Sequence, residues 1–288
     1  MHQAPQHNCR VLAFPTKGIL CTHVESERHF SRHSHSSYGL GVVDQGAQRS
    51  ISGRGSVDSK AGDVITTNPG EVHDGRPLGG VSRRWRMVYV EPDVMASLGV
   101  TCAAAASADV ELIHPVIADP ELARSIRRLL DRAEAWGMGR TTADEASMAC
   151  EEALVLTAAL LLARHAIAAK QPEVACHVQR ARDRLADDLL QAPTLAELAA
   201  QAGLSRYQLL RCFQNSYGLP PHAWLRQRRA EHAHGLIARG SSLVQASTSS
   251  GFADQSHMTR VFAQIYGYTP GALRVSRTGM PGNASVPQ

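Results

Sequence analysis

The chain has 288 residues and a mass of 31.0 kDa, a length that predicts two domains. Hydrophobic residues make up 43% of it and charged residues 19%, a globular composition that excludes an intrinsically disordered protein. The formal net charge of +4 divides unevenly: residues 1–173 carry 18 Lys/Arg and 20 Asp/Glu, a net of −2, and residues 174–288 carry 12 Arg and 6 Asp/Glu, a net of +6. The basic C-terminal part is therefore predicted to bind a polyanion.

Residues 10–92 are predicted to be rich in β-strands. Short apolar segments such as Val11–Phe14, Gly39–Val43 and Trp85–Val90 are separated by turn signals, among them Asn68-Pro69-Gly70 and Gly79-Gly80. Many short strands at this spacing are typical of a sandwich or a barrel.

Two helices are predicted between residues 120 and 169. The first has Leu122, Ile126 and Leu129 at spacings of 3 and 4, with Asp119 as its candidate N-cap. The second runs from about residue 142 to 169 and is followed by the expected linker at Gln171-Pro172, so the N-terminal domain is predicted to cover residues 1–170. Small residues at 101–108 predict a loop. We expect the helices to support dimerisation through the face of Leu122, Ile126 and Leu129 and through the segment 154–162.

The sequence predicts no membrane segment and no cofactor. Its most apolar stretch, Ala153–Ala169, has 17 residues and contains Arg164 and His165, so it is shorter than the ~20 apolar residues of a membrane span. The first ten residues lack the basic and apolar regions of a signal peptide. The six cysteines form no Cys-x-x-Cys pair, which argues against a zinc site or a disulfide framework. We therefore expect a cytoplasmic protein.

The basic part contains an internal repeat. The segments SRYQLLRCFQNSYGLPP from Ser205 and DQSHMTRVFAQIYGYTP from Asp254 align without a gap at an offset of 49 residues. In each copy an N-cap residue, Ser205 or Asp254, opens a helix, and a glycine, Gly218 or Gly267, closes it. A short helix and a turn containing glycine precede each copy, which is the helix-turn-helix pattern.

The second helix of each copy presents an outward face once its buried i,i+4 pairs, Leu209/Phe213 and Met258/Phe262, are set aside. Arginine can bond guanine, glutamine can bond adenine, and serine or threonine can bond either, so these faces are candidates for reading DNA. A helix at 221–239 joins the copies; if it holds them about 34 Å apart, both can enter successive major grooves. The candidate DNA-contacting residues are Arg206, Tyr207, Leu210, Arg211 and Gln214 in the first copy, and Gln255, Ser256, His257, Thr259 and Arg260 in the second.

Residues 178–274 resemble the DNA-binding domain of the AraC/XylS family of bacterial transcription regulators. The resemblance implies an all-α DNA-binding domain with two helix-turn-helix motifs at 174–277, followed by a flexible tail at 278–288. The segment Ala246-Ser247-Thr248 departs from the family pattern of a larger aliphatic residue followed by alanine, so the buried face is expected to be weaker there. The residues that carry the resemblance are Leu195-Ala196-Glu197-Leu198-Ala199, Leu204-Ser205, Leu209, Arg211 and Phe213, and then Gly251-Phe252-Ala253-Asp254-Gln255-Ser256-His257, Arg260, Phe262, Gly267, Thr269-Pro270 and Arg274.

The N-terminal part is similar to the cupin-type sensor domain common in that family, through His33-Ser34-His35, Gly46, Gly62-Asp63, Asn68-Pro69-Gly70-Glu71 and His73. This resemblance implies a β-barrel at about residues 10–92 that binds a small-molecule effector in its mouth. Three neutral histidines could bind Zn²⁺ or Fe²⁺. However, the acidic ligand that cupin enzymes place shortly after the His-x-His pair is missing, and we predict no metal. The candidate effector-binding residues are His33, His35, Tyr38, His73 and Trp85.

The predicted fold class is therefore α+β with two domains: a cupin-like barrel followed by helices, and an all-α domain with two helix-turn-helix motifs. The predicted function is that of a DNA-binding transcription regulator controlled by a small-molecule effector, and not that of an enzyme; the sequence leaves open whether it activates or represses. The expected partners are double-stranded DNA, the effector, RNA polymerase and a second copy of the chain. Two alternatives stay open: a metal-dependent cupin enzyme with a DNA-binding tail, and a DNA-binding protein that has no effector.

Overall fold

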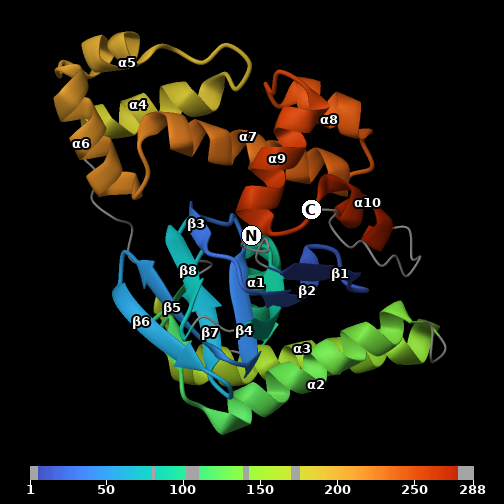
Figure 1. The fold of residues 1–288 in the computed structure, drawn as a ribbon. Helices are drawn as coiled ribbons and strands as arrows, with labels where there is room; N and C mark the ends of the chain where they lie inside the picture. The colour runs from blue at the N-terminus through green and yellow to red at the C-terminus, as the bar shows by residue number, and fades with distance from the viewer. Residues whose placement is uncertain (1–5, 80–81, 102–109, 139–142, 170–175, 278–288) are drawn as a thin grey trace. The chain divides into compact units, whose positions relative to one another are not determined.

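The computed structural model describes residues 6–79, 82–101, 110–138, 143–169 and 176–277. They fold into two compact units (Figure 1). The N-terminal unit holds most of residues 1–170, and the C-terminal unit holds most of residues 171–274. The predicted linker at Gln171-Pro172, the tail at 278–288 and all but the first residue of the loop at 101–108 lie outside the described residues.

The N-terminal unit contains two β-sheets, with the order β1-β2-β9-β4-β7-β11 in one and β3-β8-β5-β6 in the other. The sheets face each other, because Arg83 of β9 donates to the side chain of Gln48 on β5 at 2.9 Å and to the carbonyl of Gly75 on β8 at 3.2 Å. A separate small sheet pairs β10 with β12. The strands are β1 (His7–Ala13), β2 (Ile19–Ser26), β3 (Phe30–His33), β4 (Tyr38–Gln45), β5 (Ala47–Ser52), β6 (Gly55–Lys60), β7 (Val64–Thr67), β8 (His73–Pro77), β9 (Arg83–Val90), β10 (Val110–Leu112), β11 (Val116–Ile117) and β12 (Ala166–Ala168).

The central strand β4 shows how the pleat sorts residues between the two faces of the larger sheet. Tyr38, Leu40 and Val42 belong to the hydrophobic core that the sheet shares with the helices. Gly39 and Gly41 point the other way, and a Cβ at either position would overlap Thr67 or Met87, respectively. The glycines are therefore required because neighbouring strands fill the space where their side chains would lie.

Three helices accompany these sheets: α1 (Pro92–Thr101), α2 (Pro120–Gly137) and α3 (Ala143–His165). The predicted N-cap of α2 is present, since the Asp119 carboxylate accepts from the backbone amides of Glu121 at 2.9 Å and Leu122 at 3.1 Å. The predicted dimerisation faces are mostly occupied within the unit. Leu122, Ile126 and Leu129 are fully buried, and the apolar faces of α2 and α3 form one core with the sheet. The face of Leu122, Ile126 and Leu129 is thus covered within the unit, because amphipathic periodicity identifies a buried face without identifying what covers it, and dimerisation stays a prediction.

Helix α3 is long and apolar enough, by length and composition alone, to cross a membrane. The core helix of a globular protein meets the same criterion, and one side of α3 lies in the shared core through Cys150, Leu154 and Leu161. Its remaining side carries two of the more exposed apolar side chains of the unit, Met148 at 60% and Leu156 at 56%.

The C-terminal unit is all-helical, as predicted. Helices α5 and α6 form one helix-turn-helix pair and α8 and α9 form the other, with α7 between them (Figure 1). The described helices are α4 (Cys176–Asp187), α5 (Leu195–Ala202), α6 (Arg206–Tyr217), α7 (Pro221–Ala238), α8 (Leu243–Ser249), α9 (Gln255–Tyr266) and α10 (Pro270–Arg277).

The local signals of the repeat have the structures that were predicted for them. The Ser205 hydroxyl accepts from the amide of Gln208 at 3.2 Å, and the Asp254 carboxylate accepts from the amide of His257 at 2.6 Å. Gly218 and Gly267 adopt left-handed backbone conformations, with φ of 71° and 75°. The paired side chains Leu209/Phe213 and Met258/Phe262 are fully buried, so each second helix is fixed to its own subdomain.

Candidate nucleic-acid interface and ligand site

Helix α6 presents most of its predicted face to solvent. Arg206, Tyr207, Arg211 and Gln214 are exposed, and Leu210 is half-buried. The Arg211 guanidinium lies over the Tyr207 ring, 5.8 Å from its centroid, in a cation–π contact. Because this contact leaves the guanidinium edge available, Arg211 can still donate to a base or a phosphate.

Helix α9 presents a similar face. Gln255, Ser256 and Arg260 are exposed, whereas His257 and Thr259 are half-buried. The Thr259 hydroxyl donates to the carbonyl of Gln255 at 2.8 Å, and the His257 ring contacts Phe252 edge-on at 5.4 Å between centroids. Thr259 and His257 are therefore partly committed to the protein, which makes Gln255, Ser256 and Arg260 the freer donors of this helix.

The two arginines that recur in the repeat, Arg211 and Arg260, could instead have bridged to acidic side chains. In the part of the chain that the structure describes, neither forms an ion pair. Both are exposed, so their charges are available to an external anion such as a phosphate or the edge of a base.

The weaker buried face expected before the second turn is present. Ala246 and Ser247 of α8 are buried, and the Ser247 hydroxyl has no hydrogen-bond partner among the described residues. Gly251 in the turn after α8 has φ of 75°, and a Cβ there would overlap the carbonyl oxygen of Leu189 and lie 2.9 Å from Nε of Arg229. The chain therefore needs glycine at this position, where the second motif closes against the segment after α4.

The structure brings three of the predicted effector-binding residues together. His33 ends β3, His35 follows in the loop before β4, and His73 begins β8. Each offers a ring nitrogen, and these nitrogens lie within 4.8 Å of one another. Three imidazoles at this spacing could share one metal ion or bind one polar group of a ligand.

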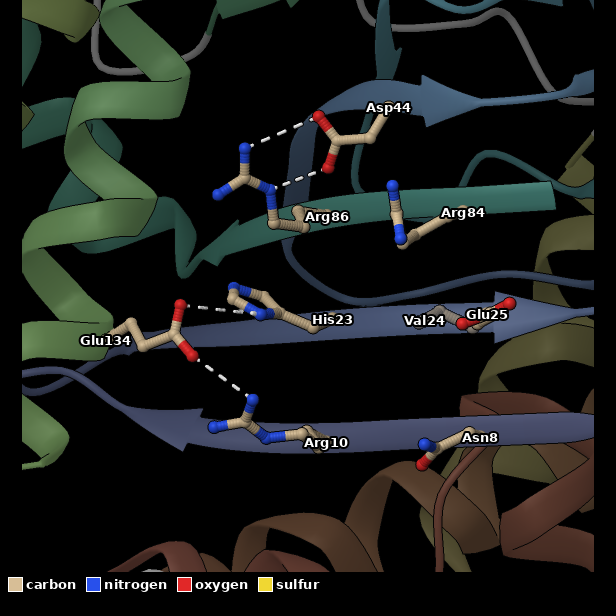
Figure 2. Close-up of a pocket in the computed structure, with 9 residues that line it drawn as sticks. All are labelled: Asn8, Arg10, His23, Val24, Glu25, Asp44, Arg84, Arg86 and Glu134. Carbon is tan, nitrogen blue, oxygen red and sulfur yellow. Dashed lines mark hydrogen bonds and ion pairs between the residues drawn. The ribbon is translucent and has the colours of Figure 1, made fainter.

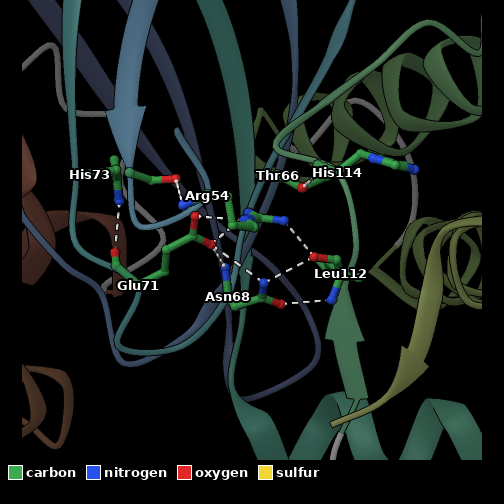
Figure 3. A network of polar contacts seen from close by, with 8 residues as sticks. Arg54, Thr66, Asn68, Glu71, His73, Leu112 and His114 are labelled. Atoms are coloured by element: carbon green, nitrogen blue, oxygen red, sulfur yellow. Dashed lines mark hydrogen bonds and ion pairs between the residues drawn. The ribbon is translucent and has the colours of Figure 1, made fainter. Parts of the chain in front are cut away.

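A polar network holds His73 in place (Figure 3). The ring nitrogen Nδ1 of His73 contacts the carbonyl of Glu71 at 2.9 Å, and burial lowers the pKa of the ring, so it stays neutral at pH 7. The Glu71 carboxylate accepts from Arg54 at 2.9 and 2.6 Å and from the amide of Asn68 at 3.0 Å. The carboxylate next to the histidines is thus committed to Arg54.

The same network reaches strand β10. The Arg54 guanidinium donates to the carbonyl of Leu112 at 2.5 Å. The Asn68 side chain accepts from the Leu112 amide at 2.8 Å and donates to its carbonyl at 3.1 Å. Sequence reasoning identified Asn68 and Glu71 only as part of a turn motif and missed Arg54. The signal that could have identified these residues is a turn between two strands that is rich in polar residues and is followed by a histidine.

The other two predicted effector-binding residues lie elsewhere. Tyr38 is on the face of β4 that packs on the helices, and its hydroxyl donates to the carbonyl of Val110 at 2.7 Å. Trp85 packs against Phe30 and against the guanidinium of Arg83, which is 4.8 Å from the Trp85 ring centroid. Tyr38 was misplaced because a one-residue step along a strand reverses the direction of the side chain. Sequence reasoning also missed Arg83, which is buried.

Comparison with known proteins identifies matches to both units. A family described as an AraC-like ligand binding domain matches residues 17–157, and a family described as a helix-turn-helix domain matches residues 198–276. Together these matches cover most of the chain.

Individual proteins match in the same way. The chain is 26% identical over 250 residues to YbfI of Bacillus subtilis, an uncharacterized HTH-type transcriptional regulator, and the match covers 85% of each chain. It is 38% identical over 82 residues to the transcriptional activator NphR of Rhodococcus, covering 28% of this chain and 24% of that one. The crystal structure of apo ToxT, a variant from Vibrio cholerae, superposes with a TM-score of 0.51 at 12% identity, covering 94% and 96% of the two chains. At that identity the likeness concerns the fold.

Proposed function

The chain belongs to the AraC/XylS family of transcription regulators, and from this membership we propose that it binds specific DNA sites through α6 and α9 under the control of a small molecule in the N-terminal unit. The single observation that carries the DNA-binding proposal is the repeated, exposed arginine without an acidic partner in the described residues, Arg211 on α6 and Arg260 on α9. Each lies on a helix that is capped, closed by glycine and anchored by a buried aromatic residue. Such a helix is a rigid element for entering a major groove.

Mapping of bound sites in the native host, followed by binding measurements on a selected site, tests this proposal. Arg211→Ala and Arg260→Ala should each weaken specific binding by about 1–3 kcal/mol, because each removes a donor to a base or phosphate. Arg49→Ala, which removes an arginine of β5 in the N-terminal unit that pairs with Asp58, should leave affinity unchanged. Equal affinity in all three variants would contradict the proposed reading face.

We also propose that the effector binds at His33, His35 and His73. Their convergence supports a polar anchor inside the barrel, and the network of Arg54, Glu71 and Asn68 would transmit a change at His73 to β10. The genes beside the mapped sites supply candidate compounds. A compound that raises the melting temperature of the wild-type chain should have little effect on His35→Ala; an unchanged shift in that variant would place the effector elsewhere.

We propose that two copies pair through the outward side of α3, which includes part of the predicted segment 154–162, since the face of Leu122, Ile126 and Leu129 is occupied. Met148 and Leu156 are exposed apolar side chains eight residues apart, about two turns of the same helix. Leu156→Glu should lower the sedimentation coefficient to that of a single chain if the wild type is a dimer. Ile51→Glu changes an exposed apolar residue on β5 and should not. A dimer that survives Leu156→Glu excludes this surface.

The histidine cluster also favours one alternative, a metal-dependent enzyme. We propose instead that the chain regulates without catalysis: the carboxylate of Glu71, whose backbone carbonyl contacts His73, is committed to Arg54, and YbfI and NphR are described as transcription regulators. Stoichiometric iron, nickel or zinc that is lost in His33→Ala would favour the enzyme. We further propose a cytoplasmic location and activation through RNA polymerase, which transcription in vitro from a mapped promoter would test.

A further inference from the structure

A polar groove lies on the face of the larger sheet beside α2, apart from the histidine cluster (Figure 2). Its volume is about 550 Å³, within the usual range of small-molecule sites. The strands β1, β2 and β9 are in register and place two rows of side chains along it. One row is Arg10, His23 and Arg86, and the other is Asn8, Glu25 and Arg84.

The row nearer to α2 is neutralised within the protein. Arg86 donates to Asp44 at 2.7 and 3.3 Å and to Asp131 at 2.7 Å. Arg10 donates to Glu134 at 3.1 Å, and burial lowers the pKa of His23 to about 4, so its ring is uncharged at pH 7. This end of the groove therefore offers polar atoms but little net charge.

The second row is different, because its members are not engaged. Asn8, Glu25 and Arg84 are exposed, and within the described residues their side chains form no hydrogen bond or ion pair. Glu25 and Arg84 are direct cross-strand neighbours with opposite charges, yet they are not paired (Figure 2). The groove thus presents one carboxylate and one guanidinium side by side, with the amide of Asn8 next to Glu25.

The distribution of charge selects among classes of ligand. A simple anion placed on Arg84 would be repelled by Glu25, and a simple cation placed on Glu25 would be repelled by Arg84. An apolar ligand would find little to contact, because Val24 is the one apolar residue among those that line the groove, and its side chain points to the other face of β2 from those of His23 and Glu25. A zwitterion with neighbouring charges satisfies both groups, since a guanidinium binds a carboxylate through two parallel bonds and a carboxylate accepts from an ammonium group.

We propose that this groove is a second binding site, which takes a small zwitterion of the α-amino acid class, with its carboxylate on Arg84 and its ammonium group on Glu25. The site is independent of the effector site proposed at the histidines. It would give the N-terminal unit a separate means of sensing polar metabolites.

Calorimetric titration of the full-length chain with the common L-α-amino acids, one at a time at millimolar concentration, tests the proposal. At least one should bind, and its N-acetyl and carboxamide derivatives, which each lack one charge, should bind at least about tenfold more weakly. Arg84→Gln and Glu25→Gln should each cause a similar loss. Both residues are exposed, so both variants should fold, which circular dichroism would check. Arg49→Gln is the matched control on the other sheet and should bind as the wild type does.

Three results would overturn the proposal. The first is that no amino acid binds. The second is binding that is unchanged in Arg84→Gln or in Glu25→Gln, which would place the ligand elsewhere. The third is acetate or phosphate binding as tightly as the amino acid and independently of Glu25, which would make the groove a simple anion site. The proposal is supported if Arg84→Gln and Glu25→Gln both lose amino acid binding while His35→Ala keeps it. This outcome does not depend on where the effector of the proposed function binds.

Discussion

Gly251→Ala should loosen the second helix-turn-helix motif far more than the equivalent change in the first. At Gly251 the backbone has φ of 75°, a conformation that costs an L-residue roughly 1–2 kcal/mol. A Cβ at this position would also overlap the carbonyl oxygen of Leu189, which accepts a hydrogen bond from Nε of Arg229 at 2.8 Å. Displacing that carbonyl costs about 1–3 kcal/mol more, because it takes away the acceptor of a charged donor. The two contributions add to a loss of stability of about 2–5 kcal/mol.

Gly203→Ala is the matched control. Gly203 closes the first motif with φ of 66°, and a Cβ there would meet no heavy atom within 4 Å. Gly203→Ala should therefore lower the free energy of unfolding only through the left-handed backbone conformation, by roughly 1–2 kcal/mol. Urea titration of the full chain, with amide hydrogen exchange measured on peptides from residues 195–277, gives the stability of the C-terminal unit directly. Equal losses in the two variants would refute the argument, because they would mean that the contact with Leu189 contributes nothing.

Three further predictions concern single buried groups. Ser247→Ala should stabilise the C-terminal unit by about 1 kcal/mol, since it removes a buried hydroxyl without a partner; a loss of stability in urea titration would show that the hydroxyl is bonded. Burial lowers the pKa of His234 from 6.5 to about 4, so as the pH falls the unfolded chain takes up the proton before the folded chain does. The free energy of unfolding should therefore be at its full value above pH 6.5 and should fall by about 3 kcal/mol towards pH 4. His234→Gln should flatten that part of the pH profile. Asn68→Ala removes both side-chain hydrogen bonds to Leu112 and should lower the free energy of unfolding by about 2 kcal/mol. It should also speed amide exchange in residues 110–112. Unchanged exchange there would show that Asn68 does not hold β10.

The helix-turn-helix motifs were predictable in detail because their signals are local. Ser205 and Asp254 bond amides three residues away, and Gly218 and Gly267 adopt a conformation that glycine favours over every other residue. Such contacts depend on the order of residues within one turn of helix. The convergence of the histidines was predictable in part, through a resemblance that covers both the His33-Ser34-His35 motif and the distant His73.

The sheet surfaces were not predictable to the same degree. Tyr38 was expected beside the histidines, but it faces the helices, because the pairing of β4 with β9 decides which side of the strand is inward. Arg84 and Arg86 are two residues apart on β9, so they lie on the same face of that strand. That they line a groove with Glu25 and His23 depends on the register between β2 and β9, which no local pattern specifies.

The sequence by itself determined the two-part organisation, the basic C-terminal part, the caps and turns of two helix-turn-helix motifs, and most of the residues that the second helix of each motif exposes. These follow from charge and from interactions within a few residues. Tertiary structure alone decided that the apolar faces of α2 and α3 are covered by their own sheet, that Glu71 is committed to Arg54, and that Glu25 and Arg84 lie side by side without pairing. The physical reason is that each of these contacts joins segments far apart in the chain, whose partners are chosen by strand register and by packing rather than by neighbouring residues.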